Sequence, residues 1–180
     1  MPVTVRRRRP DDIPALARAL LDQQPETRYP FRDPLPISIE QFLHAEDAVA
    51  AWTAEIDGRP VGHVCRTGPV SGFADADELN RVCAEAHGCD VGALSWVTSL
   101  FVAGDARGLG VGRDLLATVI DDIRSAAAYP CLEVLPVHPA AQVLYRSAGW
   151  REVHRLRPAW LRDAAGDQGP DVVVMVGPPA

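Results

Sequence analysis

The chain contains no lysine, and its 18 basic residues, all of them arginine, are outnumbered by 24 acidic residues, so the formal net charge is −6. Overall charge therefore gives the protein no general attraction to nucleic acid or to anionic membranes, and neither is expected as a partner. The sequence also lacks the ~20 consecutive apolar residues that cross a bilayer and the apolar stretch of a secretory signal. We expect a cytoplasmic protein.

Cysteine is scarce too, at four residues. None of the four falls at a metal-finger or redox spacing, and Cys65 and Cys131 have apolar neighbours in the sequence, so reduced thiols are expected. Cys83, His87 and Cys89 cluster loosely, but no fourth ligand lies nearby in the sequence. A metal site is therefore not expected.

One basic run, Arg6 to Arg9, interrupts the acidic composition. Two interpretations stay open: a patch that binds phosphate, or an edge strand whose arginines are solvated or ion-paired. Because successive side chains of a strand point to opposite faces, four consecutive arginines do not all face one ligand. The edge strand is the favoured interpretation.

The length of 180 residues and the apolar content of 47% suit one domain, residues 1–180, with an ordinary core. Asp57 and Gly58 are a turn pair favoured in two-residue hairpins, and residues 68–93 insert an amphipathic helix. The order of elements predicts an α/β (α+β) fold, a mixed sheet flanked by helices on both faces. The expected strands are 2–9, 48–56, 59–67, 94–102, 131–135, 150–157 and 171–176. The expected helices begin near Ile13, before an irregular loop at 24–38, and span 38–44, 76–86 and 111–127, and a last short helix holds residues 140–145 and ends at Gly149.

The most informative stretch runs from Leu100 to Leu116, where a strand leads into a helix through a loop with glycines at 108, 110 and 112. Glycine lets a ligand approach the main chain closely. The first N–H groups of a helix have no partner within it and lie at the positive end of its dipole, so they form an anion site. A phosphate or pyrophosphate is the expected occupant of this glycine loop, residues 107–112.

Spacing separates the known kinds of phosphate-binding loop. A Walker loop needs Gly-Lys-Ser/Thr, whereas Gly112 is followed by Arg113 and Asp114. A dinucleotide fingerprint, Gly-x-Gly-x-x-Gly, fails because the third glycine comes one residue early and no second nucleotide-binding half follows. The pattern that remains is Arg/Gln-x-x-Gly-x-Gly/Ala, which Arg107, Gly110 and Gly112 satisfy.

With this loop the sequence resembles the GCN5-related N-acetyltransferase (GNAT) superfamily. A second motif supports the resemblance, because residues 138–150, His-Pro-Ala-Ala-Gln-Val-Leu-Tyr-Arg-Ser-Ala-Gly-Trp, are similar to the family's Asn-x-x-Ala-x-x-Leu-Tyr-x-x-x-Gly-Phe. The expected strand lies between the two motifs. The resemblance covers the whole order of elements, is most specific over residues 98–150, and implies a mostly antiparallel sheet.

The resemblance implies acetyl-CoA as co-substrate and gives roles to particular positions. Main-chain N–H groups of the glycine loop would bind the pyrophosphate, and Val102 would hydrogen-bond the pantetheine arm. Leu100 would offer its N–H to the thioester carbonyl, and Tyr145 would protonate the departing thiolate. The expected catalytic residues are Tyr145 and Leu100. The expected cofactor-binding residues are Leu100, Phe101, Val102, Arg107, Gly108, Leu109, Gly110, Val111, Gly112, Arg113, His138 and Tyr145.

Two positions depart from the family pattern. His138 stands where asparagine is most frequent, and Trp96 stands where many relatives carry a carboxylate that acts as general base. No acidic residue occurs between Leu94 and Gly104, so proton removal would use a residue elsewhere, a chain of waters or no base at all. The candidates by strand position are Glu55, His63 and Glu133.

The resemblance therefore predicts an N-acetyltransferase in which an amine attacks the thioester directly in a ternary complex. A small-molecule amine is the leading acceptor, and a protein N-terminal amine is the alternative. A non-catalytic acyl-CoA-binding module is an alternative of another class, in which Tyr145 only packs in the core. Residues 20–43 and 157–170 are expected to shape the acceptor pocket, and the insert at 68–93 either covers that pocket or forms a homodimer contact.

Overall fold

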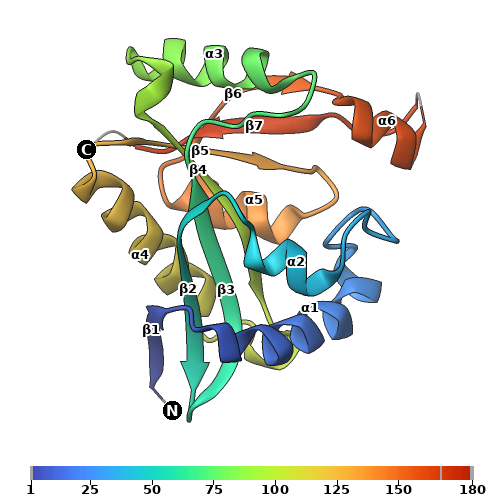
Figure 1. Cartoon of the computed structure of the whole chain (residues 1–180), viewed down its shortest axis with the longest axis vertical. Coiled ribbons are helices and arrows are strands. Elements are labelled where there is room, and N and C mark those ends of the chain that lie inside the picture. The colour runs from blue at the N-terminus through green and yellow to red at the C-terminus, as the bar shows by residue number, and fades with distance from the viewer. Residues whose placement is uncertain (1, 167, 179–180) are drawn as a thin grey trace. The chain divides into compact units, whose positions relative to one another are not determined.

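A computed structural model describes residues 2–166 and 168–178 (Figure 1). Its seven strands are hydrogen-bonded in the order β1-β2-β3-β4-β5-β7-β6. β1 and β2 pair antiparallel, as do β5 and β7 and also β6 and β7, whereas β4 and β5 run parallel. The mixed, mostly antiparallel α/β fold is thereby confirmed. The strands are β1 (Val3–Arg7), β2 (Ala48–Ile56), β3 (Arg59–Thr67), β4 (Leu94–Val102), β5 (Tyr129–Val134), β6 (Arg151–Leu156) and β7 (Val172–Val176). The helices are α1 (Ile13–Thr27), α2 (Ile39–His44), α3 (Ala76–His87), α4 (Val111–Ser125), α5 (Pro139–Ser147) and α6 (Ala159–Ala165).

The chain divides into two compact units, residues 1–66 with 97–121 and residues 67–96 with 122–180. In the first unit, α1 and α2 pack together against the end of β4. The helical spacing of α1 places Ile13, Leu16, Ala17 and Leu20 on one buried face, whereas Leu21 is exposed. The buried cluster contains Ile13, Leu16, Ala17, Leu20, Leu43 and Phe101.

The first unit contains the helix cap and the hairpin turn that its sequence indicates. Ser38 Oγ accepts a hydrogen bond from the Gln41 amide at 3.1 Å, and Gln41 Oε1 accepts one from the Ser38 amide at 3.0 Å, which forms the capping box of α2. Asp57 and Gly58 have φ angles of 50° and 77°, as a two-residue hairpin turn requires. α1 is longer than predicted and continues to Thr27.

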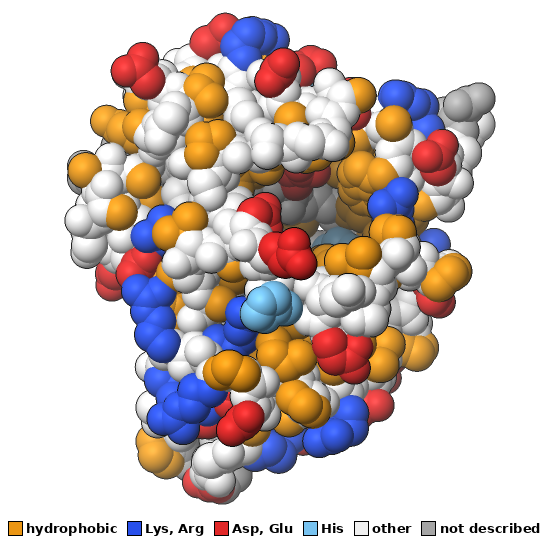
Figure 2. Space-filling model, viewed as in Figure 1, with side chains coloured by type: hydrophobic (Ala, Val, Ile, Leu, Met, Phe, Trp, Pro, Cys, Tyr) orange, Lys and Arg blue, Asp and Glu red, His pale blue; other side chains and the backbone are white. Residues whose placement is uncertain are grey.

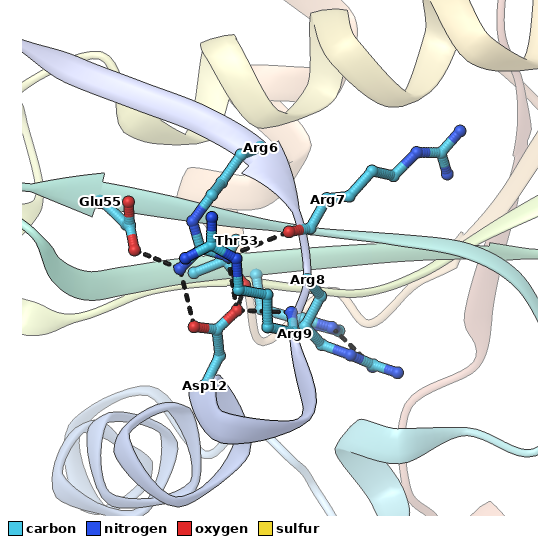
Figure 3. A network of polar contacts seen from close by, with 8 residues as sticks. Arg6, Arg7, Arg8, Arg9, Asp12, Thr53 and Glu55 are labelled. Carbon is cyan, nitrogen blue, oxygen red and sulfur yellow. Dashed lines mark hydrogen bonds and ion pairs between the residues drawn. The ribbon is translucent and has the colours of Figure 1, made fainter.

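The arginine run forms β1 and the segment that leads to α1. Arg6 makes a bidentate ion pair with Asp12, at 2.7 and 2.8 Å, and also pairs with Glu55 on β2 (Figure 3). Asp12 further accepts hydrogen bonds from the Arg9 amide at 2.7 Å and from Thr53 Oγ1 at 2.9 Å. These contacts fasten the edge strand to β2 and to the start of α1.

The side chains of the neighbouring arginines point in alternate directions, as in a strand. Arg7 points away from the Asp12 network in Figure 3, and its guanidinium lies 4.4 Å from the ring centroid of Trp52. Arg8 donates to the carbonyls of Leu43 and His44, at the end of α2. In Figure 2, arginine side chains gather over the region that β1 occupies in Figure 1. The ion-paired edge strand is therefore confirmed.

Removal of the Asp12 charge should destabilise the fold. Burial alone would raise the pKa of Asp12, but hydrogen bonds from Arg6, the Arg9 amide and Thr53 outweigh it and lower the pKa to about 2. The carboxylate therefore stabilises the protein above its unfolded pKa, and this contribution is lost as the pH falls from about 4 to about 2. Asp12→Asn should lower the free energy of unfolding at pH 7 by about 3 kcal/mol, measured by urea denaturation.

Asp105→Asn is the matched control for this prediction. Asp105 pairs with Arg59 at 2.8 Å, but both side chains are more than half exposed. Its loss should change stability by less than about 1 kcal/mol. Equal effects of the two substitutions would contradict a stabilising role for the buried network.

The second unit contains α3, α5, α6, β5, β6, β7 and the start of β4. The helix α3 lies along β6 and β7 in Figure 1, and its Leu79 and Cys83 are fully buried. Asn80 accepts hydrogen bonds from the Val70 amide and from Trp96 Nε1, each at 3.1 Å, and donates to the Val70 carbonyl at 2.8 Å. The predicted helix of the insert is confirmed, and Asn80 fixes the loop before it.

One helix of the second unit was not predicted. The segment between the last two strands contains α6, which spans seven residues and buries Leu161 completely. A helix this short depends on tertiary packing and carries too little periodicity to be recognised. Among all the helices in the described part of the chain, none has the length and apolarity to cross a bilayer.

Candidate functional site

The glycine loop joins β4 to α4 in the first unit and is exposed from Arg107 to Gly110. Gly108 and Gly110 adopt φ angles of 76° and 88°, which L side chains rarely adopt. A Cβ atom at either position would meet no atom within 4 Å, so open space lies over the loop. Leu109 lies between them and is 56% exposed. The loop thus offers its main chain to a ligand.

The helix α4 begins directly after this loop. The Gly110 carbonyl accepts hydrogen bonds from the amides of Arg113, at 2.9 Å, and Asp114, at 3.1 Å, which close the first turn. The N–H groups that precede this turn have no partner within the helix and lie at the positive end of its dipole. An anion such as a diphosphate would find donors here in a ready arrangement.

A glycine on β3 lets α4 approach the sheet. A Cβ atom on Gly62 would lie 3.0 Å from Leu115 Cδ1, 3.0 Å from the Phe101 carbonyl oxygen and 3.2 Å from Val111 Cγ1. With a side chain at this position, Leu115, Val111 or the Phe101 carbonyl would have to move by a few tenths of an ångström. Sequence reasoning missed Gly62, although a glycine inside a strand is a signal of close backbone approach.

The predicted residues on β4 alternate between its faces. Phe101 is 4% exposed and belongs to the buried cluster under α1 and α2, so only its main chain is available to a ligand. Leu100 and Val102 are half-buried and point to the opposite face. Ser99, just before them, has a φ of 53°, so β4 is irregular at this point.

Arg107 does not project freely from the loop. Its guanidinium donates to Gln23 Oε1 at 2.7 Å and lies 3.9 Å from Glu26, both on α1. Gln23 is buried and also donates to the Tyr29 carbonyl at 2.7 Å, so it connects the glycine loop to the segment after α1. Arg113 is exposed on the first turn of α4.

The second predicted motif lies in the second unit, on α5. Tyr145 is 7% exposed, and its ring centroid lies 5.9 Å from that of Trp150. Burial raises the pKa of Tyr145 above its usual value, so the phenol keeps its proton at neutral pH. His138 occupies the N-cap position of α5, and its carbonyl accepts from the Gln142 amide at 3.2 Å. The structure thus groups the residues from Leu100 to Arg113 in one unit and His138 with Tyr145 in the other.

Two of the three candidate bases already make an ion pair or hydrogen bonds with other groups of the protein. The Glu55 carboxylate pairs with Arg6. His63 is fully buried, with Nδ1 3.0 Å from the Ser99 carbonyl oxygen and Nε2 3.2 Å from Arg8 Nη1. Burial, and then the charge of Arg8, lower the pKa of His63 to about 4. Neither side chain is suited to accept a proton from a substrate.

Glu133 differs from both. It lies on β5 opposite Val174, on the same face as Cys131, which packs against α3. Burial, and then the charge of Asp75, raise the pKa of Glu133 to about 7. Asp75 Oδ2 accepts a hydrogen bond from the Ala159 amide at 3.2 Å, which brings the start of α6 to the same region. A carboxylate that titrates near neutral pH is suited to act as a general base.

The cysteines do not form a recognisable metal centre. All four are free thiols. His87 Nε2 lies 3.1 Å from the Pro130 carbonyl, and its ring centroid lies 5.2 Å from that of Tyr129. Among the residues that the structure describes, no group of three or more His, Cys, Asp or Glu side chains could hold a metal ion.

Comparisons with known proteins agree with this geometry. The sequence model of the acetyltransferase (GNAT) family matches residues 15–150. Among curated protein sequences, none matches the chain significantly.

Several solved structures share the fold. A ribosomal-protein-alanine N-acetyltransferase from Brucella melitensis is 24% identical, with a TM-score of 0.69 over 96% of this chain and 98% of that one. The ribosomal-protein-S18-alanine N-acetyltransferase from Escherichia coli is 18% identical, with a TM-score of 0.66 over 99% and 95%. A putative acetyltransferase from Salmonella typhimurium, solved with its cofactor acetyl-CoA, is 15% identical, with a TM-score of 0.69 over 97% and 92%.

Proposed function

Because the chain belongs to the acetyltransferase (GNAT) family, we propose that it transfers the acetyl group of acetyl-CoA to the amine of a small molecule. The observation that carries the proposal is the open space at the N-terminal end of α4, beside residues 107–112. This place is called the mouth of α4. Gly108 and Gly110 leave space over the loop, and the first N–H groups of α4, which lack partners within the helix, lie directly after it. This arrangement suits the diphosphate of the coenzyme better than any other ligand considered from the sequence.

The first unit would hold the co-substrate. The N–H groups of the glycine loop bind the diphosphate, and the main chain of Val102 hydrogen-bonds the pantetheine arm. When bound, acetyl-CoA supplies an activated acyl carbon. Leu100 then donates its N–H to the acyl oxygen, where negative charge develops during the attack of the amine. A fixed donor at that oxygen stabilises the transition state more than the ground state.

Glu133 and Tyr145 would make the proton transfers. Glu133 takes a proton from the incoming ammonium, so that the free amine can form the new C–N bond at the acyl carbon. As the C–S bond breaks, the Tyr145 hydroxyl gives its proton to the sulfur, and the amine nitrogen loses its remaining excess proton to solvent. The products are an amide and free coenzyme A, and Tyr145 is reprotonated from water. The pKa of Glu133, about 7, keeps a useful fraction of the base ionised at neutral pH.

Contacts in the segment after α1 support this acceptor class. Arg28 lies 4.9 Å from the ring centroid of Phe31, and the rings of Tyr29 and Phe42 meet edge to face at 6.4 Å. An acceptor with an apolar body and an acidic group would find aromatic rings for the body and an arginine for the acid here. A protein N-terminal amine is the second candidate, because two structures with this fold carry the name ribosomal-protein-alanine N-acetyltransferase.

A panel of amines with acetyl-CoA, followed by release of free thiol, tests the proposal. The panel should include small amines with carboxylates and peptides that begin with alanine. Tyr145→Phe should lower kcat by about 10²-fold and leave the Kd for acetyl-CoA unchanged, because only the proton donor is removed. Tyr129→Phe, which removes a hydroxyl elsewhere in the same unit, is the control and should keep full activity. No thiol release with any amine would support the non-catalytic module instead.

A further inference from the structure

Ser99 has an unusual backbone conformation inside β4. Its φ of 53° lies in the left-handed region, where a serine within a strand is strained, and the residue is buried. Such a conformation persists only where surrounding groups hold it. The groups that hold Ser99 also bear on Leu100, which follows it directly.

A histidine on β3 holds the Ser99 carbonyl. His63 Nδ1 lies 3.0 Å from the Ser99 oxygen, and His63 Nε2 lies 3.2 Å from Arg8 Nη1. A carbonyl oxygen only accepts hydrogen bonds, and a guanidinium only donates them. Both partners therefore require the same neutral tautomer, with the proton on Nδ1 and a lone pair on Nε2.

Arg8 is itself fixed in place. It is half-buried and donates to the carbonyl oxygens of Leu43 and His44, where α2 ends. The chain of contacts thus runs from the end of α2 through Arg8 and His63 to the irregular point of β4. Every member of this chain belongs to the first unit.

The Ser99 oxygen and the Leu100 N–H belong to one planar peptide group. In a trans peptide the C=O and N–H bonds point in opposite directions, so a partner that fixes the oxygen also fixes the direction of the N–H. A hydrogen bond to the oxygen polarises the group and makes its N–H a stronger donor. We propose that Arg8 and His63 are positioning residues that orient the Ser99–Leu100 peptide, so that the Leu100 N–H is aimed at the acyl oxygen before the amine attacks. This inference rests on the proposed function.

Two substitutions of His63 separate positioning from packing. His63→Asn keeps an N–H near the place of Nδ1 but loses volume, whereas His63→Leu fills more of the space and offers no donor. His63→Leu should lower kcat at least about 10-fold, while His63→Asn stays within about 5-fold of the unchanged protein. The Kd for acetyl-CoA should stay within about twofold in both. A packing role predicts the opposite order, with the smaller asparagine more harmful, and that order would overturn the inference.

A spectroscopic measurement decides the inference independently of turnover. Nitrogen-15 spectra of the full chain at pH 7 should show the His63 proton on Nδ1. The Leu100 amide resonance should move in His63→Leu and return towards its original position in His63→Asn. A proton on Nε2 would overturn the inference. So would a Leu100 amide resonance that keeps its position in both variants. If the unchanged protein acetylates no amine, the proposed function fails, and the spectra still decide whether His63 orients this peptide.

Discussion

Glu133→Gln should lower kcat by about 10²- to 10³-fold while the protein stays folded and binds acetyl-CoA normally. Glutamine has nearly the shape of glutamate but cannot accept the proton of the incoming ammonium. The same change should raise the free energy of unfolding at pH 8 by about 1–3 kcal/mol, because burial penalises the ionised carboxylate. A loss of activity together with a gain in stability would distinguish a catalytic base from a structural residue.

The pH dependence gives a second measurement of the same role. The pKa of Glu133 is raised to about 7, and the base acts in its ionised form, so kcat/KM should rise with pH up to about 7 and then level off. This rise of kcat/KM with pH, the acid limb of the profile, should disappear in Glu133→Gln. Asp75→Asn removes the nearby like charge and keeps an oxygen for the Ala159 amide, so the limb should shift to lower pH.

Glu152→Gln is the matched control for the base. Glu152 lies on β6 in the same unit, where it pairs with Arg155 at the surface, and this pair lowers its pKa. Its loss should change neither kcat nor the pH limb. If Glu152→Gln and Glu133→Gln have equal effects on kcat, Glu133 is not the base.

Gly110→Val should weaken acetyl-CoA binding by about 30-fold or more. Gly110 has a φ of 88°, and a β-branched residue there would move the main chain out of this conformation. The N–H groups at the mouth of α4 would then turn away from the diphosphate. Isothermal titration with acetyl-CoA measures the change directly. In thermal unfolding, acetyl-CoA at 100 times its Kd should stabilise the unchanged protein by about 2.7 kcal/mol, and the variant by much less at the same concentration.

Gly72→Val provides the control for backbone strain. Gly72 has a φ of 84°, and a Cβ atom there would also meet nothing within 4 Å, but it lies in the insert and not in the glycine loop. Both substitutions should therefore destabilise the fold to a similar degree. Only Gly110→Val should affect the coenzyme. Normal acetyl-CoA binding by Gly110→Val would refute the diphosphate site at the mouth of α4.

Elements with strong local signals could be predicted to the residue. Strands were expected at 48–56, 59–67 and 94–102, and β2, β3 and β4 have these bounds. The Asp-Gly turn fixes the hairpin between β2 and β3. The end of α1 was predicted too early, because Pro25 indicates a loop, yet the helix continues through it. Proline at that point fits a helical φ, and Gln23 secures the last turn through its bond to the Tyr29 carbonyl.

The candidate site also has a part that local sequence predicts and a part that depends on long-range contacts. The glycine loop and the mouth of α4 follow from the sequence, because glycine conformation and unpaired helix amides are local properties. The contact between Arg107 and Gln23 joins residues 84 positions apart, and that between His63 and Ser99 joins residues 36 apart. No local pattern predicts such pairs. The same holds for the choice of Glu133 among the three candidate bases, since burial and the charge of Asp75 depend on the folded chain.

The absence of a side chain at Gly62 limits how this enzyme can be redesigned. Libraries that change the acceptor would vary strands near the proposed site, and β3 is the neighbour of β4 in the sheet. Even alanine at this position would push against Leu115 and the Phe101 carbonyl and shift the opening turns of the helix. A selection for new acceptors should therefore hold residue 62 constant, because substitutions there would disturb the packing of α4 against β3.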